Sequence, residues 1–290
     1  MRILDRSGAS AKLEHLGFLP DVMEKFLQSL AKPYGLILVC GPTGSGKSYT
    51  LSAAITAIKN SEDKILTAEN PVEYNLDGVV QVQVNPDLKM GPDKVFDFST
   101  ALRSFLRQDP DIIMVGEIRD KETAQIAMEA SMTGHLVLST LHTNDAPSAI
   151  SRLSEMGVHT FLVANTVECV LAQRLIGTLC GNCKEEDKNP SAELLKQLEL
   201  HKIDYKNATF MKIHPGGCSK CGGRGMKGRT AIHEILVMNE DLRRFCIKEV
   251  SVGPIKEKAM SYGMRSLFQD GLIKVTMGLT TYEEIMAAAS

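Results

Sequence analysis

Tryptophan is absent from this sequence of 290 residues, and Phe, Trp and Tyr together account for only 5% of it. Proteins that bind single-stranded nucleic acid commonly stack bases on aromatic side chains and follow the phosphate backbone with positive charge. Here 33 Lys and Arg stand against 35 Asp and Glu, so the formal net charge is −2. We therefore expect no nucleic-acid partner and no general attraction to an anionic membrane surface.

Long hydrophobic runs are also missing. No apolar segment approaches the ~20 residues that a membrane-spanning helix needs. The longest runs, such as residues 35–40, have the length of a strand. Residues 2–5 do not begin an apolar core of the kind found in a signal peptide. We therefore expect a cytoplasmic protein, whose seven cysteines are mostly reduced.

Residues 36–141 alternate between strand-like apolar runs and helical patterns. Such alternation is typical of an α/β fold with a mainly parallel sheet. The runs at 36–40, 111–116 and 135–141 are almost continuously apolar, as expected for strands that are buried on both faces. We interpret residues 87–97 as a surface loop. The other expected strands are 65–68, 79–84 and 230–237, and the expected helices are 21–31, 47–59, 98–107, 121–132, 147–156, 161–175, 192–201 and several within 239–290.

A phosphate-binding loop follows the first of these strands. Residues 41–48, GPTGSGKS, match the pattern G-x-x-x-x-G-K-[ST] and lie between an expected strand and an expected helix, as the motif requires. Glycines allow backbone N–H groups to turn toward phosphate oxygens, and the helix N-terminus adds a favourable dipole. Lys47 would reach the β- and γ-phosphates, and Ser48 would ligate Mg²⁺. The residues predicted to bind ATP are Gly41, Pro42, Thr43, Gly44, Ser45, Gly46, Lys47, Ser48 and Tyr49.

Polar side chains follow three further expected strands. Glu69 and Glu73 come after the strand at 65–68, Glu117 and Arg119 after the strand that ends at residue 116, and His142 directly after the strand that ends at residue 141. In an open α/β sheet, ligands bind beyond the carboxyl ends of the strands. Each residue alone could be a solvated loop charge, but their shared placement favours one catalytic site around the phosphate loop. Glu117 and Ser48 are the predicted magnesium ligands.

Four of the cysteines form two C-x-x-C pairs with 34 residues between them. Paired knuckles of this kind in a cytosolic protein are typical of a tetrahedral zinc site, with redox-active dithiols and unligated thiols as the alternatives. Four thiolates would leave no open coordination position, so the predicted zinc would support folding rather than catalysis. The predicted ligands are Cys180, Cys183, Cys218 and Cys221.

Residues 41–48, 67–74, 102–120 and 133–144 resemble the Walker A, Asp box, Walker B and His box of the type II secretion and type IV pilus assembly ATPases. The four cysteines match the assembly branch of this family. The resemblance implies a RecA-like P-loop NTPase domain with a mainly parallel sheet, followed by a tetracysteine zinc module and a C-terminal helical subdomain. The implied division is 1–32, a linker from an N-terminal domain; 33–177, the ATPase core; 178–232, the zinc module; and 233–290, the helical subdomain.

The same resemblance implies roles for individual residues. Glu117 would be the Walker B acid near Mg²⁺ and water, Glu69 and Glu73 the acids of the Asp box, and His142 a sensor of the γ-phosphate. Such enzymes work as homohexamers in which arginines complete a neighbouring site. The candidates for this role are Arg103, Arg107 and Arg119.

The implied function is an ATP-hydrolysing motor that powers assembly of type IV pili or type II secretion pseudopili. Its partners would be an inner-membrane platform protein and a cytoplasmic adaptor, with the motor peripheral on the inner membrane. Asn70 stands where the family has Asp, which leaves a nucleotide-gated scaffold with little turnover as one alternative. A nucleic-acid motor is the other, because zinc knuckles can bind nucleic acid.

Overall fold

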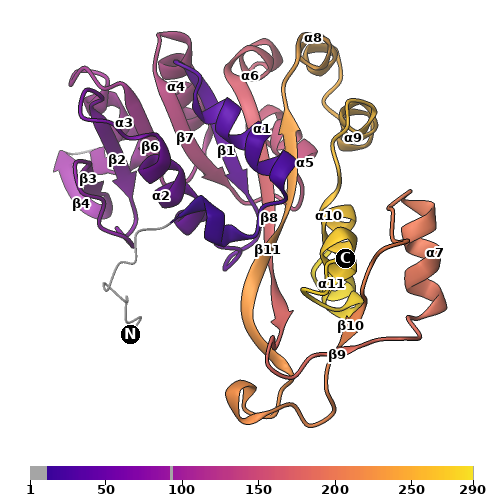
Figure 1. Ribbon diagram of the computed structural model, residues 1–290. Coiled ribbons are helices and arrows are strands. Elements are labelled where there is room, and N and C mark those ends of the chain that lie inside the picture. The colour runs from indigo at the N-terminus through magenta and orange to yellow at the C-terminus, as the bar shows by residue number, and fades with distance from the viewer. Residues whose placement is uncertain (1–11, 92–93, 290) are drawn as a thin grey trace.

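The computed structural model describes residues 12–91 and 94–289 (Figure 1). Its centre is a seven-stranded sheet in the order β11-β8-β1-β7-β6-β2-β3. All neighbouring strands are parallel except β11, which is antiparallel to β8. The predicted α/β class with a mainly parallel sheet is therefore confirmed. The strands are β1 (Gly35–Cys40), β2 (Ile65–Glu69), β3 (Val80–Gln83), β6 (Ile112–Val115), β7 (Leu136–Leu141), β8 (Val167–Leu179) and β11 (Met226–Val237).

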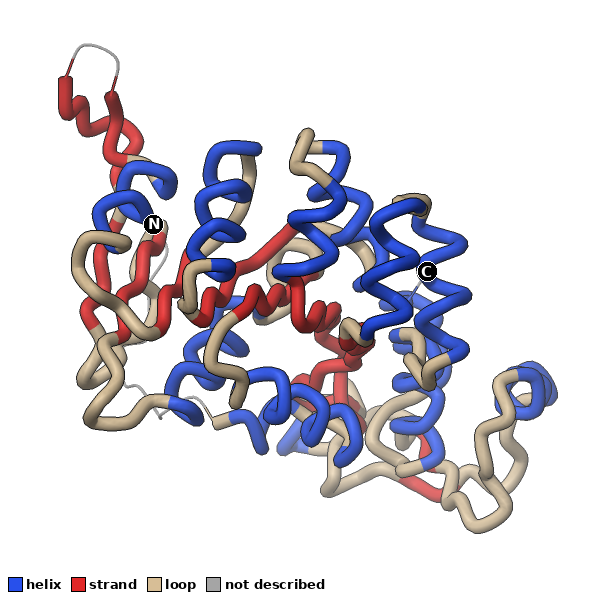
Figure 2. Tube along the Cα trace, turned by 90° about the horizontal axis from the view of Figure 1, so that it is seen from above, coloured by secondary structure: helices blue, strands red, loops and turns tan. Residues whose placement is uncertain are grey.

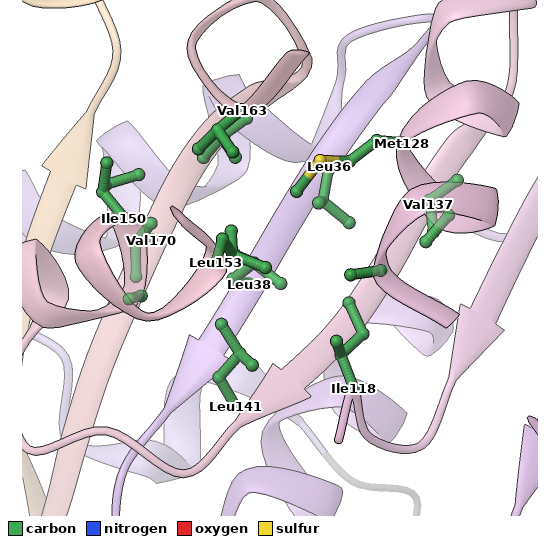
Figure 3. Packing of buried hydrophobic residues seen from close by; sticks show 14 of the residues in the cluster. Leu36, Leu38, Ile118, Met128, Val137, Leu141, Ile150, Leu153, Val163 and Val170 are labelled. Carbon is green, nitrogen blue, oxygen red and sulfur yellow. The ribbon is translucent and has the colours of Figure 1, made fainter. Parts of the chain in front are cut away.

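Helices cover both faces of this sheet (Figure 2). Strand β1 shows why, since all six of its residues are buried and residues 36–40 alternate between two hydrophobic clusters. Leu36 and Leu38 belong to one cluster, which Figure 3 shows from close by, and Ile37 and Val39 belong to the other. The first cluster includes α3 (Phe98–Phe105), α4 (Lys121–Met132), α5 (Ala146–Glu155) and α6 (Thr160–Thr166), and the second includes η1 (Leu13–Leu16), α1 (Pro20–Leu30) and α2 (Lys47–Ile58).

Aspartate N-caps set the start of three helices on the first face. Asp97, Asp120 and Asp145 precede α3, α4 and α5, and each accepts a hydrogen bond from the backbone N–H three residues later, at 2.8–2.9 Å. Such caps satisfy N–H groups that have no partner within the helix. They fix how soon α4 and α5 begin after β6 and β7, and therefore how the short connections at the sheet edge run.

The expected helix at 161–175 is wrong beyond its first turns. Helix α6 ends at Thr166, and Val167 begins the 13-residue strand β8 between β1 and β11. Residues 167–173 of that strand are all buried. A short apolar run fits a buried helix and a buried strand equally well, so periodicity could not separate them. The expected surface loop at 87–97 is also different, because β4 (Asn85–Gly91) and β5 (Lys94–Phe96) form a hairpin; residues 92–93 lie outside the described part.

Strands β8 and β11 continue beyond the main sheet as a two-stranded ribbon toward the four cysteines (Figure 1). The ribbon carries a third hydrophobic cluster, in which Ile176 and Ile232 pack with residues of α7, α10 and α11. Both strands run across the domain boundaries expected at 177/178 and 232/233, and that division stays a prediction. The remaining elements are β9 (Glu185–Glu186), α7 (Ala192–Leu200), β10 (Met211–Lys212), η2 (Ser219–Cys221), α8 (Glu240–Lys248), α9 (Val252–Ser261), α10 (Leu267–Thr276) and α11 (Tyr282–Ala289).

The predicted helical C-terminal region matches α8 to α11, each of which is ten residues or shorter. Across the ranges 12–91 and 94–289, no helix combines the length and the hydrophobicity that a membrane span requires. Residues 1–11 of the expected linker lie outside the described residues. Residues 12–32 contain η1 and α1, which pack on the sheet through Leu16, Val22 and Phe26.

Candidate functional site

A cleft of about 850 Å³ lies at the edge of the sheet where β1, β2, β6 and β7 end. Each of these parallel strands delivers its following loop to the same edge, as expected for an open α/β sheet. The cleft brings together most of the residues predicted from the sequence. Those that line it are Thr43, Gly44, Ser45, Gly46, Lys47, Ser48, Tyr49, Glu69, Glu73, Glu117, Arg119 and His142.

The phosphate loop has the geometry of an anion site. Gly44 and Gly46 have φ values of 81° and 89°, which favour glycine, and a Cβ at Gly44 would meet no atom within 4 Å. Helix α2 begins at Lys47 without a side-chain cap, so its first N–H groups can face a ligand. The Ser45 hydroxyl is buried and has no hydrogen-bond partner in the described structure. These features fit a bound phosphate group.

Lys47 is held by its own loop. Its Nζ donates to the carbonyl oxygens of Gly41 at 2.7 Å and Pro42 at 3.1 Å, and only 9% of the residue is exposed. Burial lowers the pKa of Lys47, while the nearby Glu117 carboxylate opposes this shift. The Lys47 ammonium is held by neutral carbonyl oxygens and forms no ion pair with a carboxylate among the described residues, so its charge is available to an anionic ligand.

Glu117 joins the ends of β6 and β7. Its Oε1 lies 2.6 Å from Nη2 of Arg119, and its Oε2 lies 3.3 Å from Nε2 of His142. The Glu117 side chain is 13% exposed, whereas the two partners are 68% and 49% exposed. A half-enclosed carboxylate of this kind can hold a divalent cation or orient water, while the exposed partners can turn toward an incoming phosphate.

Glu69 ends β2, the strand next to β6, and its side chain is held within the cleft by hydrogen bonds. Its Oε1 accepts hydrogen bonds from the Thr67 hydroxyl at 2.7 Å and from Nε2 of Gln81 at 2.9 Å, and Glu69 is 7% exposed. Gln81 also donates to the Tyr74 carbonyl and accepts from the Leu76 N–H. This glutamine of β3 therefore positions both the acid and the loop that carries Asn70 and Glu73. Its role was missed because no local pattern distinguishes it from a strand surface residue.

Two predicted arginines lie away from the cleft. Arg103 of α3 donates to Glu122 at 2.8 Å, and both side chains are more than half exposed. Arg107 follows α3 and is exposed. Arg119 is the one member of the predicted arginine set that lines the cleft.

Residues that carried no functional prediction complete the opposite wall. His15 and Leu16 of η1 line the cleft, as do Leu175 of β8 and Arg229 and Thr230 of β11. Gly17 allows this approach, because a Cβ there would lie 1.9 Å from the Thr230 hydroxyl oxygen. These contacts link segments more than 200 residues apart, which a local sequence pattern cannot reveal.

The four predicted metal ligands lie together. All four sulfur atoms are within 4.8 Å of one another, with 3.8 Å between Cys180 and Cys218 and 3.9 Å between Cys183 and Cys221. Tetrahedral Zn–S bonds of about 2.3 Å place sulfur atoms about 3.8 Å apart, so the spacing fits zinc. The N–H groups of Cys218 and Gly225 donate to the Cys221 sulfur, and such bonds lower the pKa of this thiol to about 6.

Glu234 of β11 supports the segment after His142. The residue is 1% exposed, and its Oε1 accepts from the Ala146 N–H at 2.8 Å, where α5 begins. Burial raises the pKa of this carboxyl group to about 6, an effect that the Asp145 carboxylate reinforces and that the Ala146 N–H and Lys256 oppose.

We expect this shift to make stability depend on pH. The folded state retains a proton on Glu234 that the unfolded chain releases near pH 4.5, so its contribution is complete below pH 4.5 and is lost as pH rises to about 6. The difference is about 2 kcal/mol in the free energy of unfolding. Glu234→Gln should match the wild type in urea unfolding at pH 4.5 and exceed its stability at pH 7.5. A difference that stays constant between these pH values would contradict the expectation.

A mainly parallel sheet with a phosphate loop after β1 and an acidic residue after β6 defines a protein of the P-loop NTPase class. The chain matches the model of the family described as Type II/IV secretion system protein over residues 1–287. This match spans nearly the whole sequence, and the chain belongs to that family. The family predicted from the sequence motifs is thus confirmed.

Individual relatives are similar over the same extent. The type IV pilus assembly ATPase PilB of Thermus thermophilus is 48% identical over 287 residues, which are 99% of this chain and 31% of that protein. The type II secretion system ATPase E of Vibrio cholerae is 44% identical over 290 residues, 99% of this chain and 54% of that protein. The chain therefore spans from about a third to about half of the length of these relatives.

A solved structure supports the same fold. The structure described as the pilus retraction motor PilT with bound ADP has a TM-score of 0.69 and 26% sequence identity. The match covers 98% of this chain and 68% of the PilT chain. The Legionella pneumophila ATPase DotB has a TM-score of 0.66 at 25% identity. This match covers 95% of this chain and 64% of the DotB chain.

Proposed function

We propose that this chain binds ATP with Mg²⁺ in the cleft and hydrolyses the bond to the γ-phosphate. The observation that carries the proposal is the meeting of Lys47, with its uncapped helix, and the Glu117–Arg119–His142 cluster in one cleft. Relatives named as pilus assembly and type II secretion ATPases support the same activity. The hydrolysis would power assembly of type IV pili or of type II secretion pseudopili.

The residues divide the chemistry between them. Lys47 would exchange its carbonyl partners for the β- and γ-phosphates, and the loop N–H groups would bind the same oxygens. Ser48 and Glu117 would hold Mg²⁺, which neutralises charge that develops on the phosphate oxygens. Glu69 and Glu73 would orient the attacking water, and His142 would contact the γ-phosphate.

A ring of identical subunits fits the placement of the arginines. Arg103 and Arg107 are exposed outside the cleft, so they could act only on a site that another subunit brings to them. We propose a homohexamer in the cytoplasm, bound peripherally to the inner membrane through a platform protein and a cytoplasmic adaptor. The similarity to a structure described as a pilus retraction motor supports a role for the chain in a pilus machine. Zn²⁺ on the four cysteines would hold the end of the ribbon folded.

Phosphate release by the purified chain tests the activity. The wild type should hydrolyse ATP with Mg²⁺ and lose this activity when EDTA is added, because the phosphate charge is then not neutralised. Nucleotide-dependent ring formation without phosphate release would favour the scaffold, to which Asn70 points because it lacks the negative charge of Asp. Salt-sensitive stimulation by single-stranded DNA would favour a nucleic-acid motor.

A further inference from the structure

Gln173 of β8 lies directly behind the phosphate loop. The last residue pair between β1 and β8 is Cys40 with Ala172, so Gln173 is level with Gly41, where the loop leaves β1. Alternation along β8 places Gln173 on the same sheet face as Leu171, toward α2. Gln173 is 0% exposed and does not line the cleft, so it has no direct access to a ligand.

The Gln173 side chain connects two parts of the loop–helix unit. Its Nε2 donates to the Ser45 carbonyl oxygen at 2.6 Å, and its Oε1 accepts from the Thr50 hydroxyl at 2.7 Å. Thr50 is also fully buried. One amide therefore joins the tip of the loop to the second turn of α2, and each end of the amide has a partner of the right chemical type.

The loop packs against this residue closely enough to require glycine. A Cβ at Gly41 would lie 2.4 Å from the Gln173 carbonyl oxygen, and a Cβ at Gly46 would lie 3.1 Å from its Nε2. The contact at Gly41 is too close for any Cβ, and the contact at Gly46 is tight enough that the Gln173 amide would have to shift. The glycines of the motif therefore allow the loop to pack closely against β8, in addition to allowing its backbone to approach phosphate.

The bond to Ser45 has a directional consequence. A peptide unit is planar and trans, so its C=O and N–H groups point in opposite directions. Because Gln173 holds the Ser45 carbonyl from behind, the N–H of Gly46 is directed away from Gln173. Gly46 lines the cleft, whereas Gln173 does not. The amide of Gln173 therefore fixes the orientation of a donor that can reach a phosphate oxygen.

We infer that Gln173 is a positioning residue for nucleotide binding, which holds the Ser45–Gly46 peptide in the orientation that a phosphate group needs. This inference rests on the proposed function, because it concerns the same cleft. A residue that only filled the core would be replaceable by an apolar side chain of similar size. A positioning residue would not be, since the freed Ser45 carbonyl would lose its partner and the peptide could rotate.

The test measures the affinity of mant-ADP with Mg²⁺ for the full chain. Gln173→Met keeps the length of the side chain but removes both hydrogen bonds, and it should weaken binding by about 10- to 100-fold. The KM for ATP should rise by more than kcat falls, because the loop binds substrate before chemistry begins. Melting without nucleotide should fall modestly, because the buried Ser45 carbonyl and Thr50 hydroxyl lose a partner, so affinity is measured well below the melting temperature of each variant. Gln173→Leu provides a second apolar variant if the first does not fold.

Variants of Thr50 distinguish the loss of the hydrogen bond between Thr50 and Gln173 from a general loss of packing. Thr50→Val should weaken binding alone, yet add little to Gln173→Met, because the two residues share one hydrogen bond. Thr56→Val is the matched control, since Thr56 lies on the same helix and donates only to the Ser52 carbonyl. Folded Gln173 variants that bind mant-ADP within about twofold of the wild type would overturn the inference about Gln173 but leave the proposed function intact. A wild type that binds no mant-ADP would overturn the proposed function together with it.

Discussion

Replacement of Glu117 by glutamine is expected to lower the rate of ATP hydrolysis by about 100- to 1,000-fold while nucleotide binding persists. Glutamine has nearly the same shape, and its single carbonyl oxygen can keep one of the two contacts of residue 117, with Arg119 or with His142. It lacks the negative charge that, in the proposed mechanism, would hold Mg²⁺ and polarise water. Phosphate release in a single turnover, measured beside mant-ADP affinity, separates the loss of chemistry from the loss of binding.

Two further variants define what this result means. Lys47→Ala removes the cation of the phosphate loop, so it should lose binding and hydrolysis together. Glu122→Gln makes the same chemical change as Glu117→Gln, but Glu122 is 57% exposed and pairs with Arg103 outside the cleft. Its turnover should stay within about twofold of the wild type, because exposed ion pairs contribute little. Hydrolysis that persists in both Glu117→Gln and Lys47→Ala would refute the assignment of the site.

The parallel part of the sheet could be predicted because its signals are local. The expected helix at 121–132 has the bounds of α4, and the strand expected at 36–40 differs from β1 by one residue. Buried parallel strands are mostly apolar, and the phosphate loop or an Asp cap marks where a following helix begins. Since parallel strands deliver their carboxyl ends to one edge, the convergence of Glu69, Glu117 and His142 also followed from sequence order.

The failures share a different physical cause. Strand β8 was expected to be a helix because the apolar stretch from Val167 has no period that decides between the two. Only its pairing with β1 and β11 makes it a strand, and that pairing is not encoded locally. Gln173 and the cleft residues Leu16 and Arg229 were missed for the same reason. The residues that they contact are far away in the sequence, and no local motif predicts such long-range contacts.

The four cysteines lie at the end of the long two-stranded ribbon that β8 and β11 form. Leu179 ends β8 immediately before Cys180, and Met226 begins β11 shortly after Cys221. The cluster therefore closes the open end of the ribbon, at a distance from the hydrophobic core of the main sheet. The third hydrophobic cluster packs α7 against the ribbon, but none of the four cysteines belongs to it, so metal ligation would stabilise the end that they close.

Removal of the metal is therefore expected to unfold the region 178–229 before the nucleotide-binding core. The wild type should carry about one zinc per chain, and Cys218→Ser should lose it, because a tetrahedral thiolate site depends on all four ligands. Structural zinc contributes about 10–16 kcal/mol in small zinc-binding peptides at pH 7, which is large beside the stability of a small folded region. Hydrogen exchange of Cys218→Ser should show lost protection in 178–229, while β1 and β7 remain protected.

Cys246→Ala provides the matched control for this experiment. Cys246 lies in α8, is 1% exposed and belongs to the hydrophobic core cluster of the main sheet rather than to the four-sulfur group. Its replacement should keep the zinc content and the protection of 178–229, and should lower only the stability of the core. Retention of zinc by Cys218→Ser, or a zinc-free wild type with a protected ribbon, would show that the four thiols are not a structural metal site. Loss of zinc with an intact mant-ADP affinity would instead separate the two sites, and would show that the metal serves the folding of the ribbon without forming part of the nucleotide cleft.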